Sequence, residues 1–222
     1  GRDAGVAGLV LHLSAHEFCK VEVESPRMVV GGGTRLSHFV SNAVKHGLSG
    51  PENLAGIAGT VGGALHVNLG VHGVDVSTWV RSATVLTLSG EIHQRRREDM
   101  NFSYRQSSLN ELAIVSAEFE FETAPADELT RRMQKLWIIQ RASQPNSADN
   151  SAYIFKDQGG ESASVLIEKA GLKGTRVGDV EISERDANYF LAGSNAKSAD
   201  VIRLIELVQS QVQERLGVQL EP

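Results

Sequence analysis

Residues 56–73 carry a concentration of glycine that suits the binding of a phosphate. The core of this segment reads Gly56-Ile57-Ala58-Gly59-Thr60-Val61-Gly62-Gly63, and Asn68, Gly70 and Gly73 follow it. Glycine adopts positive φ and lets the backbone approach a ligand closely, and successive free amides form a concave site for an anion such as a pyrophosphate. The order of the glycines is neither the dinucleotide-binding fingerprint nor a Walker loop. From the spacing alone, a packing turn without a ligand is an equal alternative.

Residues 102–107 form a second candidate site, with the sequence Phe-Ser-Tyr-Arg-Gln-Ser. Tyr104 and Arg105 together suit recognition of a carboxylate, because the guanidinium offers a bidentate fork and the phenol adds a hydroxyl donor. A surface loop with an incidental arginine is the commoner interpretation of a lone Tyr-Arg pair. The pair by itself leaves both interpretations open.

Composition removes several classes of function. The 222 residues carry a net charge of -5, which argues against a general nucleic-acid partner. No apolar run has the length of a membrane span. Cys19 is the single cysteine, so neither an intramolecular disulfide nor a multi-cysteine zinc site is possible, and the seven scattered histidines predict no metal site.

The pattern of apolar residues predicts two groups of elements with a boundary near residue 124. For the first group we expect strands at 4–12, 79–90 and 113–122, a return strand that starts at 91–93, a hairpin over 20–31 closed around Ser25-Pro26, and a helix over 34–47 that Thr34 caps and Gly47 ends. The inner face of strand 79–90 is open between two parities, Ala83 and Val85 or Val80, Leu86 and Leu88.

The second group begins with a helix over 125–141 that Pro125 opens. Its expected apolar stripe is Leu129, Met133, Leu136 and Trp137. A loop at 142–152, a helix at 162–170, strands within 173–182 and an amphipathic helix at 198–216 complete the prediction.

The glycine-rich segment resembles the flavin-binding loop of the UDP-N-acetylenolpyruvoylglucosamine reductase family, almost position for position. Glu52 also matches, whereas Ala58 stands where the family usually has proline. The resemblance implies that FAD is bound by Gly56, Ile57, Gly59, Thr60, Val61, Gly62, Gly63, Asn68, Gly70 and Gly73. A Tyr-Arg-x-Ser motif occupies the position of residues 104–107 in this family. The resemblance therefore implies that Arg105 is a catalytic and substrate-binding residue that meets the substrate carboxylate, with Tyr104 beside it.

Residues 150–174 resemble the substrate domain of the same family, and the pair Phe155-Lys156 matches its Phe-Lys pair. The family has a serine or cysteine proton donor two positions before this phenylalanine, so Tyr153 takes the catalytic position here. Lys156 and Asp157 are implied to bind substrate, although the family has asparagine where Asp157 stands. Because general acid catalysis depends on positioning, the larger tyrosine ring is a departure that affects chemistry.

The resemblance implies an α+β fold, with an FAD-binding domain of the vanillyl-alcohol-oxidase type at 1–124 and a smaller α/β substrate-binding domain at 125–222. It implies a cytoplasmic enzyme of peptidoglycan precursor synthesis that uses FAD and NADPH to reduce UDP-N-acetylglucosamine enolpyruvate to UDP-N-acetylmuramate. The expected partner is a UDP-sugar, with no nucleic acid, membrane or metal.

Two sets of departures from the family pattern favour two different explanations. The chain begins after the family's earlier glycine-rich segment and ends at Pro222, just before the family's catalytic glutamate. These limits favour a fragment cut from a longer protein, whereas Tyr153 and Asp157 inside the chain favour a divergent relative, a catalytically degenerate flavin-fold protein that binds a nucleotide or a protein partner.

Overall fold

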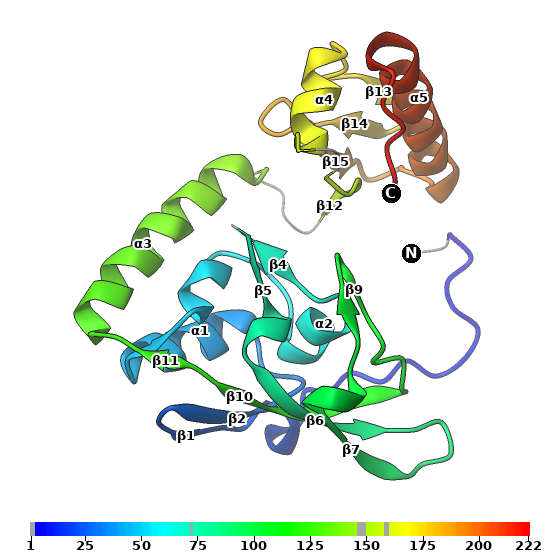
Figure 1. Cartoon of the computed structure of the whole chain (residues 1–222). Helices are drawn as coiled ribbons and strands as arrows, with labels where there is room; N and C mark the ends of the chain where they lie inside the picture. The colour runs from blue at the N-terminus through cyan, green and yellow to red at the C-terminus, as the bar shows by residue number, and fades with distance from the viewer. Residues whose placement is uncertain (1–2, 72, 146–149, 158–159) are drawn as a thin grey trace. The chain divides into compact units, whose positions relative to one another are not determined.

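The computed structural model describes residues 3–71, 73–145, 150–157 and 160–222. Contacts divide the chain into two units, Val10–Gln140 on the one hand and Arg141–Pro222 with Gly1–Leu9 on the other (Figure 1). The first part of helix α3 (Ala126–Ser143) belongs to the first unit, because Leu129 is buried in that unit's core. The domain boundary near residue 124 stays a prediction.

The first unit is built on a five-stranded antiparallel sheet. Its strand order is β1 (Val21–Glu24), β2 (Arg27–Gly31), β10 (Ala113–Glu120), β6 (Val80–Leu86) and β7 (Ile92–Arg96). The predicted hairpin around Ser25-Pro26 is confirmed as β1 and β2. Register shifts in the pairing of β10 with β6 explain the ambiguous parity of β6, because Val80, Ala83 and Val85 are all buried.

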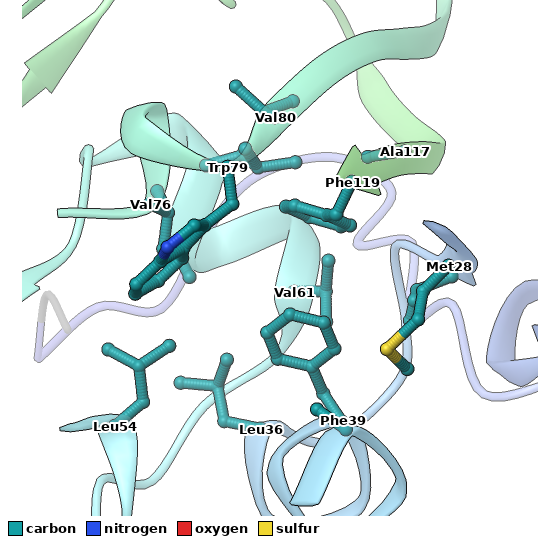
Figure 2. Packing of buried hydrophobic residues seen from close by; sticks show 14 of the residues in the cluster. Met28, Leu36, Phe39, Leu54, Val61, Val76, Trp79, Val80, Ala117 and Phe119 are labelled. Carbon is teal, nitrogen blue, oxygen red and sulfur yellow. The ribbon is translucent and has the colours of Figure 1, made fainter. Parts of the chain in front are cut away.

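Helices α1 (Leu36–Lys45) and α2 (Val61–His66) lie over the same face of this sheet (Figure 1). Leu36 and Phe39 on α1 and Val61 on α2 meet Phe119 of β10 in the core (Figure 2). Phe39 and Phe119 have ring centroids 5.1 Å apart. Burial of these large side chains is the main stabilising contribution to the unit.

Short elements connect this framework. They are η1 (His16–Cys19), β3 (Leu48–Ser49), η2 (Pro51–Leu54), β4 (Gly70–Val71), β5 (Val74–Asp75), η3 (Val76–Thr78), η4 (Arg97–Asp99), β8 (Phe102–Ser103), β9 (Gln106–Ser107) and β11 (Glu122–Thr123). The hairpin β8–β9 contacts α2, which brings the second candidate site beside the glycine-rich segment.

The second unit packs two helices against a four-stranded antiparallel sheet of order β12 (Ser151–Tyr153), β15 (Tyr189–Ala192), β14 (Val180–Ile182) and β13 (Arg176–Val177). Helix α4 (Ala163–Lys169) begins at Ser162, whose hydroxyl accepts a hydrogen bond from the Val165 amide. The predicted helix over 198–216 is confirmed as α5 (Ser198–Leu216), which ends at Gly217. The predicted loop at 142–152 includes residues 146–149, which lie outside the described residues.

Three local predictions are wrong. Residues 4–12 are not a strand, and their apolar side chains are exposed, with Leu9 at 85%; apolar content alone supplies no partner for the backbone. Thr34 does not cap α1, because the N-cap residue is Arg35. Trp137 is half exposed, whereas Leu129, Met133 and Leu136 pack on the core as expected. Gly47 ends α1 with a φ of 70°, as predicted.

Within the described ranges, no helix combines the length and the apolar character needed to cross a membrane.

Candidate active site

The first unit contains a cavity of about 400 Å³ beside the glycine-rich segment. Its lining comes from four stretches of chain that are distant in sequence: Leu11–Leu13, Gly32 and Gly33, Thr60 with Gly62, Gly63 and His66, and Leu109 with residues 111–114. Cavities of this size bind small molecules and cofactors. The fold thus gathers a pocket where the sequence predicted a ligand.

Glycines form the tightest parts of the cavity wall. A Cβ on Gly32 would lie 1.9 Å from the Ile114 carbonyl oxygen, and one on Gly33 would lie 1.8 Å from that of Leu13. A Cβ on Gly62 would lie 3.0 Å from the Gly32 oxygen. Gly32 and Gly33 exclude any side chain and Gly62 leaves little room for one, because the segments approach each other backbone to backbone.

The prediction of a row of free amides is wrong for three residues of the loop. The amide of Val61 donates to the Thr34 oxygen at 2.9 Å, and that of Gly62 donates to the Gly32 oxygen at 2.8 Å. The amide of Gly63 donates to the Thr60 hydroxyl at 3.2 Å, which caps α2. The glycines therefore serve close approach and cavity shape rather than a ring of vacant donors.

Glu111 is the acidic side chain in the lining of the cavity. Its Oε1 accepts a hydrogen bond from Arg95 Nε at 2.8 Å, and its Oε2 is buried without a hydrogen-bond partner among the described residues. A buried acceptor of this kind is costly unless something donates to it. Because Oε2 is itself shielded from solvent, Glu111 contributes to the wall through its ion pair with Arg95 rather than as an acceptor open to a ligand.

The remaining predicted loop residues do not line this cavity. Gly56, with a φ of 84°, packs against Gln140 of α3, and Val61 is buried in the core beside Phe39 (Figure 2). Gly59 and Gly73 also have positive φ, and Gly70 lies in β4 next to Asp75. Ile57 is half buried against the core. Thr60, Gly62 and Gly63 are the predicted cofactor residues that reach the lining.

Tyr104 and Arg105 form the two-residue turn of the β8–β9 hairpin, since Ser103 pairs with Gln106. Arg105 has a φ of 56°, and its guanidinium carbon lies 5.6 Å from the centre of the Tyr104 ring. A positive φ in a residue other than glycine is strained and persists where the surroundings determine it. Asn68 is buried and donates through Nδ2 to the Ser103 oxygen at 2.9 Å.

Tyr153 lies on β12 of the second unit and is 45% exposed. Its ring meets Tyr189 edge to face, with centroids 5.1 Å apart. Burial raises the pKa of Tyr153 to about 12, and a hydrogen bond with Asn188 acts in the opposite direction. The phenol keeps its proton at neutral pH, but it is a weak acid there because an efficient proton donor has a pKa near the working pH.

Lys156 and Asp157 each have a partner inside the second unit. Lys156 Nζ forms an ion pair with Glu221, and its amide donates to the Glu221 oxygen at 2.8 Å. Asp157 Oδ1 accepts from the Ala163 amide at 2.9 Å, at the start of α4. Asp157 is exposed, and its hydrogen bond to the first turn of α4 makes it a helix-stabilising residue as well as a predicted substrate residue.

Sequence reasoning missed Gly32, Gly33 and Glu111 as parts of the pocket. It interpreted residues 31–34 as a turn leading into the first helix, although three successive glycines were the signal that another backbone comes close. Glu111 carried no comparable signal, because an isolated acidic residue is ordinarily a solvated one.

Two models of known protein families match the chain. Residues 1–95 match an FAD binding domain, and residues 144–222 match the C-terminal domain of UDP-N-acetylenolpyruvoylglucosamine reductase. These matches confirm the expected α+β fold class, with an FAD-binding domain followed by the C-terminal domain of this reductase.

Curated relatives agree with the family models. UDP-N-acetylenolpyruvoylglucosamine reductase 2 of Symbiobacterium thermophilum is 38% identical over 99% of this chain, which covers 71% of that protein. The reductase of Rhodopirellula baltica is 35% identical over 99% of this chain and 72% of its own length. The crystal structure of the Thermus caldophilus reductase matches with a TM-score of 0.73 and 34% identity, over 86% of this chain and 70% of that one.

Proposed function

The chain belongs to the UDP-N-acetylenolpyruvoylglucosamine reductase family, and from that membership we propose how its residues take part in the reaction. The protein is an FAD-dependent oxidoreductase of peptidoglycan precursor synthesis. It reduces UDP-N-acetylglucosamine enolpyruvate to UDP-N-acetylmuramate. We also propose that NADPH is the reductant and that the enzyme acts in the cytoplasm.

The observation that carries the proposal is the glycine-walled cavity of the first unit. Its volume and the backbone approach at Gly32, Gly33 and Gly62 fit part of a dinucleotide cofactor. Thr60, Gly62 and Gly63 would hold it on one side, and Leu13, Leu109 and Ile114 supply apolar contact. FAD, when bound, supplies the hydride-transfer chemistry of the reaction.

Arg105 binds the enolpyruvyl carboxylate in this proposal, and Tyr104 adds a hydroxyl donor. A guanidinium matches a carboxylate with two parallel hydrogen bonds, which orients the double bond as well as binding it. Lys156 balances the negative charge of the substrate, and Tyr153 holds the proton that the substrate receives after reduction.

A glycine substitution separates cofactor binding from folding. A Cβ on Gly63 would lie 3.4 Å from the Thr60 hydroxyl oxygen, an ordinary contact, yet it would narrow the cavity. Since alanine favours a helix over glycine by about 0.5–1 kcal/mol, Gly63→Ala should keep or raise the melting temperature of the apoprotein. We expect its FAD affinity, measured by quenching of flavin fluorescence, to fall about tenfold.

The whole function is tested by oxidation of NADPH at 340 nm with the enolpyruvyl UDP-sugar, in the FAD-loaded protein. If Gly63→Ala leaves the FAD affinity unchanged, this cavity is not the FAD site. If the protein binds flavin but does not turn over the UDP-sugar, the proposed cofactor site stands and the proposed substrate is wrong.

A further inference from the structure

Asn68 ends helix α2 in a conformation that glycine ordinarily provides. Its φ is 43°, its amide donates to the Leu65 oxygen, and the Leu69 amide donates to the Ala64 oxygen at 2.7 Å. This pair of hydrogen bonds is the Schellman motif, in which the residue after the helix adopts the left-handed conformation. Asparagine tolerates that conformation, but glycine adopts it without strain.

The Asn68 side chain extends from this helix end to the turn that carries Arg105. Nδ2 donates to the Ser103 oxygen, and Ser103 directly precedes the Tyr104-Arg105 turn. Because a carbonyl oxygen only accepts, this contact also fixes which end of the amide faces the hairpin. Among the described residues other than glycine, Asn68 and Arg105 are the two with positive φ.

At Asn68, one side-chain hydrogen bond stands against two unfavourable features. Its side-chain Oδ1 is buried and accepts no hydrogen bond from the described residues. A stranded acceptor destabilises a protein, and glycine at this position would avoid both that loss and the strained φ. The residue type therefore makes sense if the Nδ2 donor to Ser103 offsets these costs.

The base of the hairpin has separate support from the same helix end. Ser107 Oγ donates to the His66 oxygen at 2.8 Å, and His66 Nδ1 donates to the Leu109 oxygen at 2.8 Å. These contacts hold the strand after the turn, whereas the Asn68 contact holds the strand before it. Asn68 itself is 2% exposed and is not part of the cavity lining.

We propose that Asn68 is a positioning residue, which holds the strained Ser103–Gln106 turn so that Arg105 presents its guanidinium to a substrate carboxylate. The inference rests on the proposed role of Arg105. The family resemblance implied that Asn68 contacts FAD directly. In the proposal Asn68 instead supports substrate binding through Arg105.

Asn68→Gly tests this role without disturbing the helix end, since glycine suits the left-handed conformation. The FAD dissociation constant should change less than twofold. The KM for the enolpyruvyl UDP-sugar should rise about fivefold, the usual effect of losing one hydrogen bond, with a smaller change in kcat. Amide hydrogen exchange at residues 103–106 should accelerate in the absence of substrate.

Asn68→Asp is a second variant, because it keeps the size and the tolerance of positive φ and, when ionised, replaces the donor by a buried carboxylate that the Ser103 oxygen repels. It should reproduce the rise in KM and the faster exchange. Ser107→Ala serves as a comparison that removes a hydrogen bond at the base of the hairpin. If Asn68→Gly weakens FAD binding and leaves the exchange of 103–106 unchanged, Asn68 is a cofactor residue and the inference is wrong.

Arg105→Ala separates the two levels of the argument. If it leaves substrate KM unchanged, the proposed role of Arg105 fails, and the inference falls with it even if exchange at 103–106 still depends on Asn68. If Arg105→Ala raises KM and Asn68→Gly does not, the positioning inference alone fails. When both hold, the double variant should be no worse than Arg105→Ala, because the effect of Asn68 acts through the arginine.

Discussion

Single residues in the second unit combine a structural role with a predicted chemical one. Tyr153 packs on Tyr189 and holds its proton tightly. Asp157 supports the start of α4 while it stands at a predicted substrate position. The consequences of changing each residue differ, because burial raises the pKa of the Tyr153 phenol, whereas the Asp157 carboxylate accepts a hydrogen bond that supports a helix.

Tyr153 should titrate well above an ordinary tyrosine. With a pKa raised by burial to about 12, against a usual value near 10, the folded protein keeps the phenol neutral where the unfolded chain ionises it. Its stabilising effect is therefore complete below about pH 10 and is lost as the pH rises towards 12. The difference in absorbance at 295 nm between the parent and Tyr153→Phe reports this titration, and a midpoint near 10 would contradict it.

Asp157→Asn should keep the fold and improve binding of an anionic substrate. The amide oxygen still accepts from the Ala163 amide, so we expect the free energy of unfolding to change by less than about 0.5 kcal/mol. Removing one exposed negative charge should lower the substrate KM about two- to fivefold at low salt. Asp157→Ala is the control, since it also removes the charge but loses the hydrogen bond. Equal KM values for the parent and both variants would rule out electrostatic repulsion.

At the scale of elements, the two helix ends at Gly47 and Gly217 share a conformation and differ in surroundings. Their φ values are 70° and 71°. A Cβ on Gly47 would lie 2.8 Å from the Ala124 oxygen, whereas one on Gly217 would meet nothing within 4 Å. The pair separates the intrinsic cost of the left-handed conformation from the cost of a tertiary clash.

Gly217→Ala should destabilise its unit by about 1 kcal/mol, the cost of placing a side chain in the left-handed region. Gly47→Ala should lose more, about 2–4 kcal/mol, because β3 and β11 must also move away from the new methyl group. Urea denaturation, monitored by hydrogen exchange in each unit, measures the loss in free energy of unfolding for both variants. Equal losses would show that the Ala124 contact relaxes without cost.

At the scale of the whole molecule, two separate hydrophobic cores stabilise the chain. One includes Phe39 and Phe119, and the other includes Phe155 and Phe190. Since each unit of the chain has its own core, damage to one core should be felt first within that unit.

Phe119→Ala should destabilise the unit of residues 10–140 by about 3–5 kcal/mol, because it leaves a cavity beside Phe39. Hydrogen exchange should then accelerate in β10 and β6, while β14 and β15 keep their protection. Leu88→Ala, at a side chain 86% exposed, is the control and should change stability by less than about 0.5 kcal/mol. Equal loss of protection in both units would indicate a single cooperative unit.

Much of the fold was predictable where the signal was local. The amphipathic helix α5, the strand β10, the hairpin at Ser25-Pro26 and the stop at Gly47 depend on neighbouring residues, so periodicity and turn chemistry sufficed to predict them. The strand expected at 4–12 failed because pairing requires a partner that a local pattern does not contain.

The sequence by itself determined the family and the reaction, because residue type and order are enough to recognise a motif. Only the tertiary structure decided that the amides of Val61, Gly62 and Gly63 are already bonded, that Glu111 pairs with Arg95 in the cavity wall and that Asn68 donates to the strand before the Arg105 turn. These properties depend on which distant segments meet. Hydrogen-bond partners and burial arise when the chain folds, and no spacing along the sequence specifies them.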